Sequence, residues 1–252
     1  MAAAGLLALM PLGVAHADEP NPPATPTEQG IAGGSGVGCA KDESTAGTIG
    51  SPQPRLTARV HGDTDNSQTA GLRADFTVDS RNADGSWTPV TATLAPSTGF
   101  VDDGTVVTAT LTTTLSPNTL YRMNAVTRSY TGSQYTVSAA TAFCYFTVDP
   151  TAPLAPRIIY GGPYTECTST HCTAHGGAGI PGTFTLAPAD GDSPIIGYRY
   201  KFRTDATWTH VSGSSATITF TPPSRTFETL EVAAQDTLSR YGASTTTSFM
   251  VA

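Results

Sequence analysis

The chain has 252 residues, of which 38% are hydrophobic and only 13% charged, and its formal net charge is −7. This length fits one large domain or two ordinary ones. Binding to phosphate groups needs clustered Lys and Arg, but the only lysines are Lys41 and Lys201, so we expect no nucleic-acid partner and no anionic membrane surface.

The N-terminus predicts export. Residues 2–14 form an apolar run that is too short to span a bilayer, and Ala15-His16-Ala17 follows it as a signal-peptidase site. The basic residues that normally open a signal peptide are missing, so the alternative is an Ala-rich tail. We interpret residues 1–17 as a signal peptide, which predicts a secreted, extracellular protein without a membrane span.

Residues 18–50 read first as a Pro-rich and then as a Gly-rich stretch with little to bury. Such a composition is typical of flexible segments, and we therefore expect a flexible leader over this range.

Four cysteines in an exported chain predict disulfides, and three pairings are possible. Cys167 and Cys172 are close enough in sequence to close a small loop, which leaves Cys39 with Cys144. An alternative is a zinc site, because the second pair lies beside two histidines, His171 and His175. The oxidising compartment favours the disulfide.

Residues 51–149 show short runs in which apolar and polar residues alternate, separated by turn clusters such as RNADGS and SPNT. This pattern, without helical periodicity, predicts an antiparallel β-sandwich. The alternating sets are Leu56/Ala58/Val60, Ala74/Phe76/Val78, Val90/Ala92/Leu94, Val107/Ala109/Leu111, Tyr121/Met123/Ala125 and Cys144/Phe146/Val148.

One segment of this first domain is more specific. Residues 115–129, LSPNTLYRMNAVTRS, fit the pattern L-x-P-x-T-x-Y-x-x-x-A. This resembles the E–F corner of fibronectin type III domains, and the resemblance implies a structural tyrosine corner in which the Tyr121 hydroxyl bonds back to the turn backbone. The alternative is an ordinary strand with a buried tyrosine.

A second β-sandwich is predicted over residues 150–252, after a Pro-rich joint at residues 148–156. Its strands read GTFTL (182–186), GYRYKF (197–202), ATITF (216–220) and TLEVAAQD (229–236). In this copy Leu230 takes the place of the corner tyrosine.

The fold class is therefore all-β, with two tandem antiparallel sandwiches of the fibronectin type III or immunoglobulin-like kind. The strand layout over residues 39–252 resembles modules of large secreted actinobacterial proteins, which often precede a LamG-like or other functional domain. The end of the chain at FMVA suits the front part of a longer protein.

Catalytic motifs are missing from the sequence, so we expect no enzyme, no catalytic residues and no cofactor. Carboxylates cluster in turns, where Asp bonds the local backbone. They are weak calcium candidates at Asp63, Asp65, Asp190 and Asp192, and we assign no metal.

The sequence thus predicts a secreted, non-catalytic binding or adhesion module with a protein or polysaccharide partner. Candidate glycan-stacking aromatics are Trp87, Tyr130, Tyr135 and Trp208, although core or hairpin packing is an alternative role for each. The two other functions to weigh are a structural spacer and a secreted enzyme or inhibitor with an unrecognised site.

Overall fold

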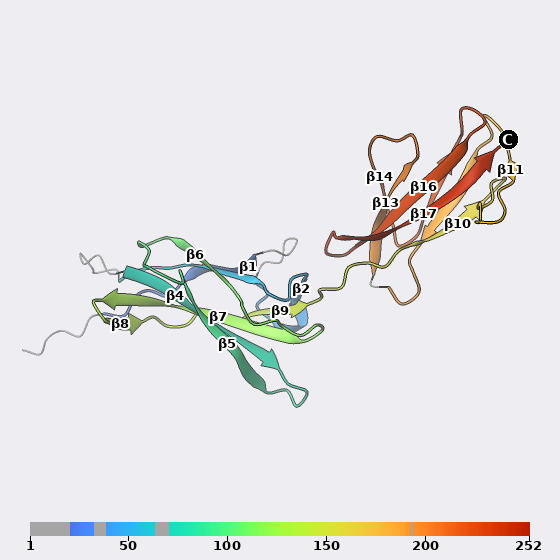
Figure 1. Ribbon diagram of the computed structural model, residues 1–252. Helices are drawn as coiled ribbons and strands as arrows, with labels where there is room; N and C mark the ends of the chain where they lie inside the picture. Colours follow the sequence, from blue (N-terminus) through green and yellow to red (C-terminus); the bar gives the residue numbers. More distant parts are fainter. Residues whose placement is uncertain (1–20, 33–38, 64–70, 193) are drawn as a thin grey trace, which may run out of the picture.

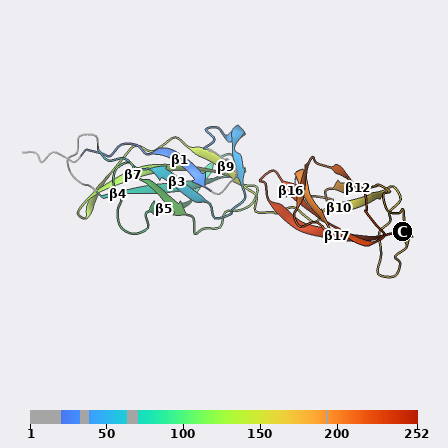
Figure 2. The same cartoon turned by 90° about the horizontal axis from the view of Figure 1, so that it is seen from above.

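The computed structural model describes residues 21–32, 39–63, 71–192 and 194–252. Two β-sandwiches lie end to end, joined by a single extended segment after β9 (Cys144–Val148), as the two views in Figures 1 and 2 show. Within the described ranges, no helix is long and apolar enough to cross a membrane. The predicted signal peptide, residues 1–17, lies outside the described residues.

The first sandwich consists of a three-stranded sheet, in the order β1-β3-β6, and a larger sheet in the order β2-β9-β7-β4-β5, with β8 paired to β7. All strand pairs in it are antiparallel except β2 with β9. Its strands are β1 (Thr27–Ala32), β2 (Gly47–Ile49), β3 (Arg55–Arg59), β4 (Gly71–Arg81), β5 (Trp87–Ala95), β6 (Val106–Thr110), β7 (Leu120–Thr131), β8 (Gln134–Val137) and β9.

The second sandwich repeats this plan. A three-stranded sheet has the order β10-β12-β15, and a five-stranded sheet has the order β11-β17-β16-β13-β14, in which only β11 pairs in parallel. Its strands are β10 (Arg157–Gly161), β11 (Ala174–His175), β12 (Gly182–Ala187), β13 (Ile195–Phe202), β14 (Thr209–Ser212), β15 (Ala216–Phe220), β16 (Phe227–Asp236) and β17 (Tyr241–Val251).

The strand orders of the two sandwiches match element by element once β8 is set aside. In each domain the first strand pairs in the smaller sheet, and a short second strand (β2 or β11) then crosses to pair in parallel with the last strand of the larger sheet. The chain is thus an all-β protein of two tandem sandwiches with the same topology.

Each sandwich has its own core, made by the inward-facing residues of the alternating runs. On β7, for example, Tyr121, Met123 and Ala125 are buried, while Arg122 and Asn124 between them are half-exposed. In the second domain the core is rich in aromatic rings, with Phe184 and Phe249 fully buried and 5.2 Å apart at their centroids. Burial of these rings is a large source of stability for each domain.

The expected flexible leader over residues 18–50 is wrong for two of its segments. Thr27–Ala32 forms β1, which pairs with β3, and Gly47–Ile49 forms β2, which pairs with β9. Ile31 and Ile49 carry these segments into the core, where they are 7% and 1% exposed. The composition did not predict these strands. A segment rich in Pro and Gly is ordered here because Ile31 and Ile49 are buried in the core and the backbone forms hydrogen bonds with β3 and β9.

The alternation expected at residues 90–94 is also corrected. Val78 pairs with Thr91 but Asp79 pairs with Pro89, so β5 contains a bulge that leaves one extra residue, Val90, on its side. Val90 packs against the core, whereas Leu94 lies on the opposite face of the sheet, where it lines an open pocket. A bulge reverses the side-chain alternation, and a strict period of two cannot show it.

Candidate functional site

The outward face of the larger sheet in the first domain is strongly polar. On β4 the outward positions are those between the core residues, and they carry Arg73, Asp75, Thr77, Asp79 and Arg81. These side chains are only half-exposed, because neighbouring strands hold them against the sheet. An antiparallel sheet with one solvated face requires polar residues there, but it does not require this density of charge.

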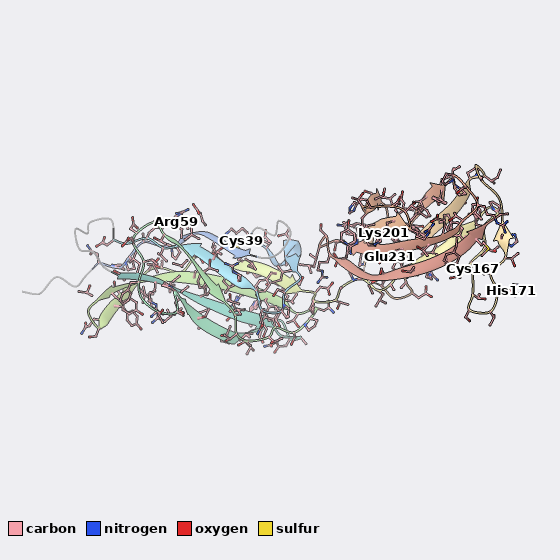
Figure 3. All side chains as sticks on the ribbon, turned by 45° about the horizontal axis from the view of Figure 1, so that its top comes forward. Cys39, Arg59, Cys167, His171, Lys201 and Glu231 are labelled. Atoms are coloured by element: carbon pink, nitrogen blue, oxygen red, sulfur yellow. A yellow bond between two sulfur atoms is a disulfide. The ribbon has the colours of Figure 1, made fainter. Side chains whose placement is uncertain are left out.

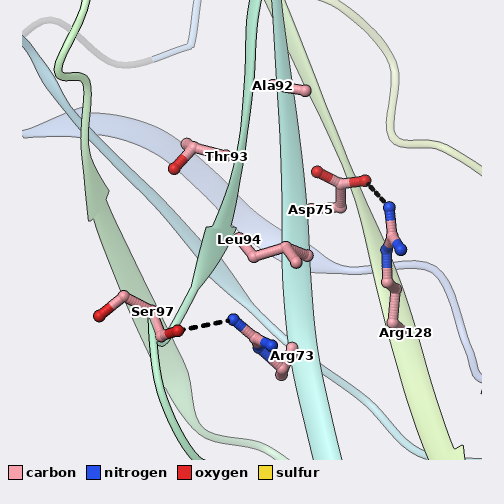
Figure 4. Close-up of a pocket in the computed structure, with 7 residues that line it drawn as sticks. All are labelled: Arg73, Asp75, Ala92, Thr93, Leu94, Ser97 and Arg128. Atoms are coloured by element: carbon pink, nitrogen blue, oxygen red, sulfur yellow. Dashed lines mark hydrogen bonds and ion pairs between the residues drawn. The ribbon is translucent and has the colours of Figure 1, made fainter. Parts of the chain in front are cut away.

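A shallow, open pocket of about 480 Å³ lies on this face between β4, β5 and β7 (Figure 4). Arg73 is fixed at one end, because its Nε and Nη2 donate hydrogen bonds to the Pro96 carbonyl at 3.0 and 2.7 Å. Nη2 also donates to the Ser97 carbonyl at 3.0 Å. The pocket is lined by Arg73, Asp75, Ala92, Thr93, Leu94, Ser97 and Arg128.

Arg128 of β7 forms an ion pair with Asp75 of β4 inside this pocket (Figure 4). Burial opposes the charge of the guanidinium, but the hydrogen bond and the charge of Asp75 outweigh it and raise the pKa of Arg128. The Arg128 guanidinium therefore keeps its charge, and with Asp75 it presents hydrogen-bonding groups to the pocket.

Three aromatic residues cluster next to the pocket. The Tyr130 ring lies 5.1 Å from the Phe100 ring and 5.2 Å from the Tyr135 ring, centroid to centroid. Phe100 is 56% exposed and Tyr135 49% exposed, so two of the three rings offer free surface. Clustered exposed aromatics of this kind mark interaction sites more often than isolated ones do.

Local structure explains why these rings meet. The β7–β8 hairpin pairs Tyr130 directly with Tyr135. Gly71 leaves room for Phe100, since a Cβ at that glycine would lie 2.4 Å from Cγ of the Phe100 ring. The two tyrosines belong to one hairpin, whereas Phe100 comes from a segment distant in sequence and meets them through the fold of the sheet.

Arg128 connects the aromatic cluster to the pocket. Its guanidinium carbon lies 4.7 Å from the Tyr135 ring centroid while its Nη2 contacts Asp75. One continuous surface thus combines exposed ring faces with fixed hydrogen-bonding groups. Ring faces attract the C–H groups of a sugar, and an arginine–carboxylate pair can bind its hydroxyls.

The four candidate aromatics do not form one site. Tyr130 and Tyr135 lie together, but Trp87 lies at the other end of the same sheet face, where the Arg122 guanidinium is 4.4 Å from its ring and 3.9 Å from the ring of Phe143. Trp208 lies in the second domain beside Arg199. The sequence motifs do not single out Phe100, Arg73 or Arg128, although Arg73 and Arg128 occupy outward positions of alternating strands.

Both disulfides are present, Cys39–Cys144 and Cys167–Cys172. Cys39 lies in the connection between the first two strands of its domain and is bonded to Cys144 at the start of β9, whereas Cys167 and Cys172 both lie in the connection between the first two strands of the second domain. The zinc alternative for the second loop therefore fails, because both sulfurs are bonded to one another. Among the described residues, no group of three or more His, Cys, Asp or Glu side chains is placed to hold a metal ion.

The weak calcium candidates have other roles where they are described. Asp190 forms an ion pair with Arg157 at 3.1 Å, and Asp192 accepts hydrogen bonds from the backbone nitrogen of Leu154 at 3.1 and 3.2 Å. Asp63 lies at the edge of a described segment, and Asp65 lies outside the described residues.

Tyr121 has the geometry of a tyrosine corner. It is 3% exposed, and its hydroxyl accepts a hydrogen bond from the Ser116 backbone nitrogen at 2.7 Å and donates to the Ser116 carbonyl at 3.3 Å. Leu230 in the second domain is fully buried and makes no such bond. The hydroxyl of Tyr121 thus fixes the turn before β7 to the strand itself.

The strand order and this corner define the class: tandem β-sandwiches with a fibronectin type III-like fold. No family model and no curated protein matches the chain. Among solved structures, it is similar to a two-domain fibronectin type III segment of chicken tenascin, with 13% identity, a TM-score of 0.28, and coverage of 90% of this chain and 99% of that one.

Two further solved structures are similar at comparable levels. The FN1–FN3 domains of chicken CNTN1 match with 16% identity and a TM-score of 0.28, over 92% of this chain and 68% of that one. Alpha-2-macroglobulin of E. coli matches with 12% identity and a TM-score of 0.28, over 92% of this chain and 16% of that one. At these scores the likenesses say nothing about a ligand.

Proposed function

We propose that the chain is a secreted, non-catalytic binding module that holds a polysaccharide on the first domain. The observation that supports this most is the continuous surface formed by Phe100, Tyr130 and Tyr135 with the Arg128–Asp75 pair. Two exposed rings next to a shallow polar pocket fit an extended, hydroxyl-rich chain better than a compact ligand, which needs an enclosed cavity.

The carboxylates at this surface do not fit the hydrolysis of a glycan. Asp75 is the one carboxylate among the lining residues, and it is ion-paired with Arg128. Glycoside hydrolysis needs two carboxyl groups facing each other across the bond to be cleaved. This surface therefore supports retention of a glycan rather than its cleavage.

The extracellular location is part of the same proposal. Two disulfides are compatible with an oxidising compartment, and the apolar N-terminal run with Ala15-His16-Ala17 is the export signal we infer. We also propose, from the strand motifs, that the chain is related to the modules of large secreted actinobacterial proteins that carry LamG-like domains.

A pull-down with insoluble polysaccharides tests the binding function. The mature protein, residues 18–252, is incubated with cellulose, chitin, xylan and peptidoglycan, and the bound fraction is measured. We expect binding to one of these, and a loss of about tenfold in affinity for Tyr135→Ala, because a stacking ring face is removed. Phe227→Ala is the matched control, since Phe227 is a 46% exposed aromatic of the second domain.

Two outcomes would contradict the proposal. If none of the polymers retained the mature protein, the proposal of a polysaccharide ligand would be wrong. Equal affinity of the Tyr135 and Phe227 variants would show that the aromatic cluster is not the binding surface. Circular dichroism of both variants distinguishes a lost contact from a lost fold.

A structural spacer is the second candidate function, and one observation favours it. Arg240 of the second domain bonds backbone carbonyls of the segment that joins the two sandwiches, at 2.8 Å from Asp149 and 2.6 Å from Thr151. A joint fixed in this way holds two modules at a set separation. Solution scattering of a variant that lacks the Arg240 guanidinium tests it.

A further inference from the structure

A second cluster of cations and aromatic rings lies on the outward face of the five-stranded sheet in the second domain, where Lys201 and Glu231 mark its position in Figure 3. The Arg199 guanidinium of β13 lies between two rings. Its central carbon is 4.6 Å from the Trp208 ring centroid and 4.4 Å from the Tyr241 ring centroid.

Arg199 is half-buried. Among the described residues its guanidinium forms no hydrogen bond and no ion pair, and its Nε is buried without an acceptor. A buried donor that lacks an acceptor is costly, typically by about 1–3 kcal/mol. A guanidinium also presents its donors in a planar fork that matches a carboxylate.

The first domain contains a similar arginine that does pair with a carboxylate. There Arg122 lies between Trp87 and Phe143 in the same kind of ring sandwich, but its Nε donates to Asp79 at 2.8 Å. Asp79 is the residue directly across from Arg122 on the neighbouring strand.

In the second domain the residues across from Arg199 supply no carboxylate. They are Ala233 on β16 and His210 on β14. The two arrangements are similar, although the arginine is on β7 in the first domain and on β13, which corresponds to β4, in the second. A carboxylate across from the arginine pairs with it in the first domain, and the position across from Arg199 holds Ala233.

The other charges around Arg199 are already engaged. Lys201 forms an ion pair with Glu231 at 3.1 Å, and Glu231 also accepts a hydrogen bond from Ser244 at 2.9 Å. The hydrogen bond from Lys201, and then the one from Ser244, lower the pKa of Glu231. The Glu231 carboxylate therefore already has two direct partners. His210 shares a 2.8 Å hydrogen bond with the Tyr241 hydroxyl. The charge of Arg199 also helps to lower the pKa of Glu231, but among the described residues Arg199 forms no direct ion pair and no hydrogen bond with it.

We propose that the Arg199–Trp208–Tyr241 cluster is a binding site for the carboxylate of an acidic sugar, with a polyuronate as the ligand class. The carboxylate takes the place that Asp79 fills in the first domain, and the sugar ring contacts the edges of the flanking Trp208 and Tyr241 rings. An open sheet face with exposed hydroxyls, such as those of Ser244 and Thr246, fits a chain lying across the strands. The choice of a saccharide rests on the proposed binding function, but the site is in the other domain.

Binding of the mature protein to polygalacturonate tests this site, with fully methyl-esterified polygalacturonate as the ligand that lacks free carboxylates. We expect isothermal titration calorimetry to detect binding to the acid form only, weakened by added salt because the contact is ionic. Arg199→Gln should lose about tenfold or more in affinity, since the pairing guanidinium is removed. Arg225→Gln is the matched control, because Arg225 is an exposed arginine of the same domain outside the cluster.

A second variant leaves Arg199 in place. Ala233→Asp puts a carboxylate directly across from Arg199, as Asp79 lies directly across from Arg122, so it should pair with Arg199 within the protein and abolish polygalacturonate binding. Because Ala233 is fully buried, a melting curve must show that this variant is folded. If it is not, the Arg199→Gln and Arg225→Gln pair decides alone.

Several results would overturn the proposal. These are equal affinities for the Arg199 and Arg225 variants, equal binding of the methyl ester, and equal binding of poly(glutamate), which would mean that charge alone is recognised. Tyr135→Ala separates this site from the one on the first domain. It should leave polygalacturonate binding unchanged, while Arg199→Gln should leave retention on the neutral polymers unchanged.

Discussion

The guanidinium of Arg240 donates a hydrogen bond from Nη1 to the backbone carbonyl of Asp149 at 2.8 Å, and so links the second sandwich to the last residues of the first. The same guanidinium donates from Nε to the Asp236 carboxylate at 2.8 Å. Asp236 is only 2% exposed and also accepts the backbone N–H groups of Leu238 and Arg240. One carboxylate thus shapes the β16–β17 turn and aims the arginine at the joint.

Replacing Arg240 with Ala should loosen this joint. The bonds to the two linker carbonyls are lost, and Asp236 is left buried without its cation, so we also expect a loss of about 1–3 kcal/mol in the unfolding free energy of the second domain. Small-angle X-ray scattering should show a wider range of interdomain arrangements, and urea denaturation measures the stability. Arg225→Ala is the control. Identical scattering profiles for the two variants would argue against a fixed joint and against the spacer function.

Gly242 tests the same joint without removing a charge. A Cβ at this position would lie 1.8 Å from the Pro153 carbonyl oxygen, so an alanine forces the linker away from the start of β17. Gly242→Ala should change the mean interdomain arrangement seen by scattering while each sandwich keeps its own melting transition. An unchanged profile would mean that the linker does not pack against β17 in solution.

Tyr121→Phe removes a single hydroxyl from the corner before β7. That hydroxyl both accepts from and donates to the Ser116 backbone, and it is buried, so we expect a loss of about 1 kcal/mol in unfolding free energy. Tyr135→Phe is the matched control, because the Tyr135 side chain is 49% exposed. Equal midpoints in urea for these two variants would show that the corner contributes nothing.

The alternating strands, the corner at Tyr121 and the disulfide pairing were predictable because each depends on local sequence or on proximity along the chain. The segment Thr27–Ala32 was not, since its order comes from pairing with β3 and from Ile31 in the core. Of the candidate sites, the sequence supplied the aromatic residues Tyr130, Tyr135 and Trp208 but not the partners that they meet. Arg128 meets Asp75, and Arg199 meets Tyr241, only because register places distant strands side by side.

The two disulfides should differ in their effect on stability. In the chain-entropy picture, the stabilisation by a crosslink rises with the logarithm of the number of residues in the loop that it closes. Cys39 and Cys144 are 105 residues apart, whereas Cys167 and Cys172 are 5 apart. We expect the paired Ser variant of the first bridge to lose about 4–5 kcal/mol and that of the second about 2 kcal/mol, measured by urea denaturation. The reverse order would mean that the short bridge has a structural role beyond closing its loop.

Alkaline pH should destabilise the second domain through Tyr160. Burial raises the pKa of Tyr160 to about 12, with the nearby charge of Glu166 acting in the same direction and the hydrogen bond to Thr247 opposing it. The hydroxyl therefore keeps its proton in the folded state at pH values where an unfolded tyrosine, with a pKa of about 10, loses it. The stabilisation is complete below pH 10 and falls as the pH rises from about 10 towards 12.

Tyr160→Phe removes this titration, so its unfolding free energy should decline less between pH 9 and pH 11 than that of the wild type. Tyr198 and Tyr200 also have raised pKa values through burial, and some decline should remain in the variant. Urea denaturation at pH 9, 10 and 11 measures both slopes. At neutral pH the variant should lose about 1 kcal/mol, because the hydroxyl bonds to Thr247 and Ser248 go with it. Parallel slopes for the two proteins would show that Tyr160 is solvated and ionises as freely in the folded chain as in the unfolded one.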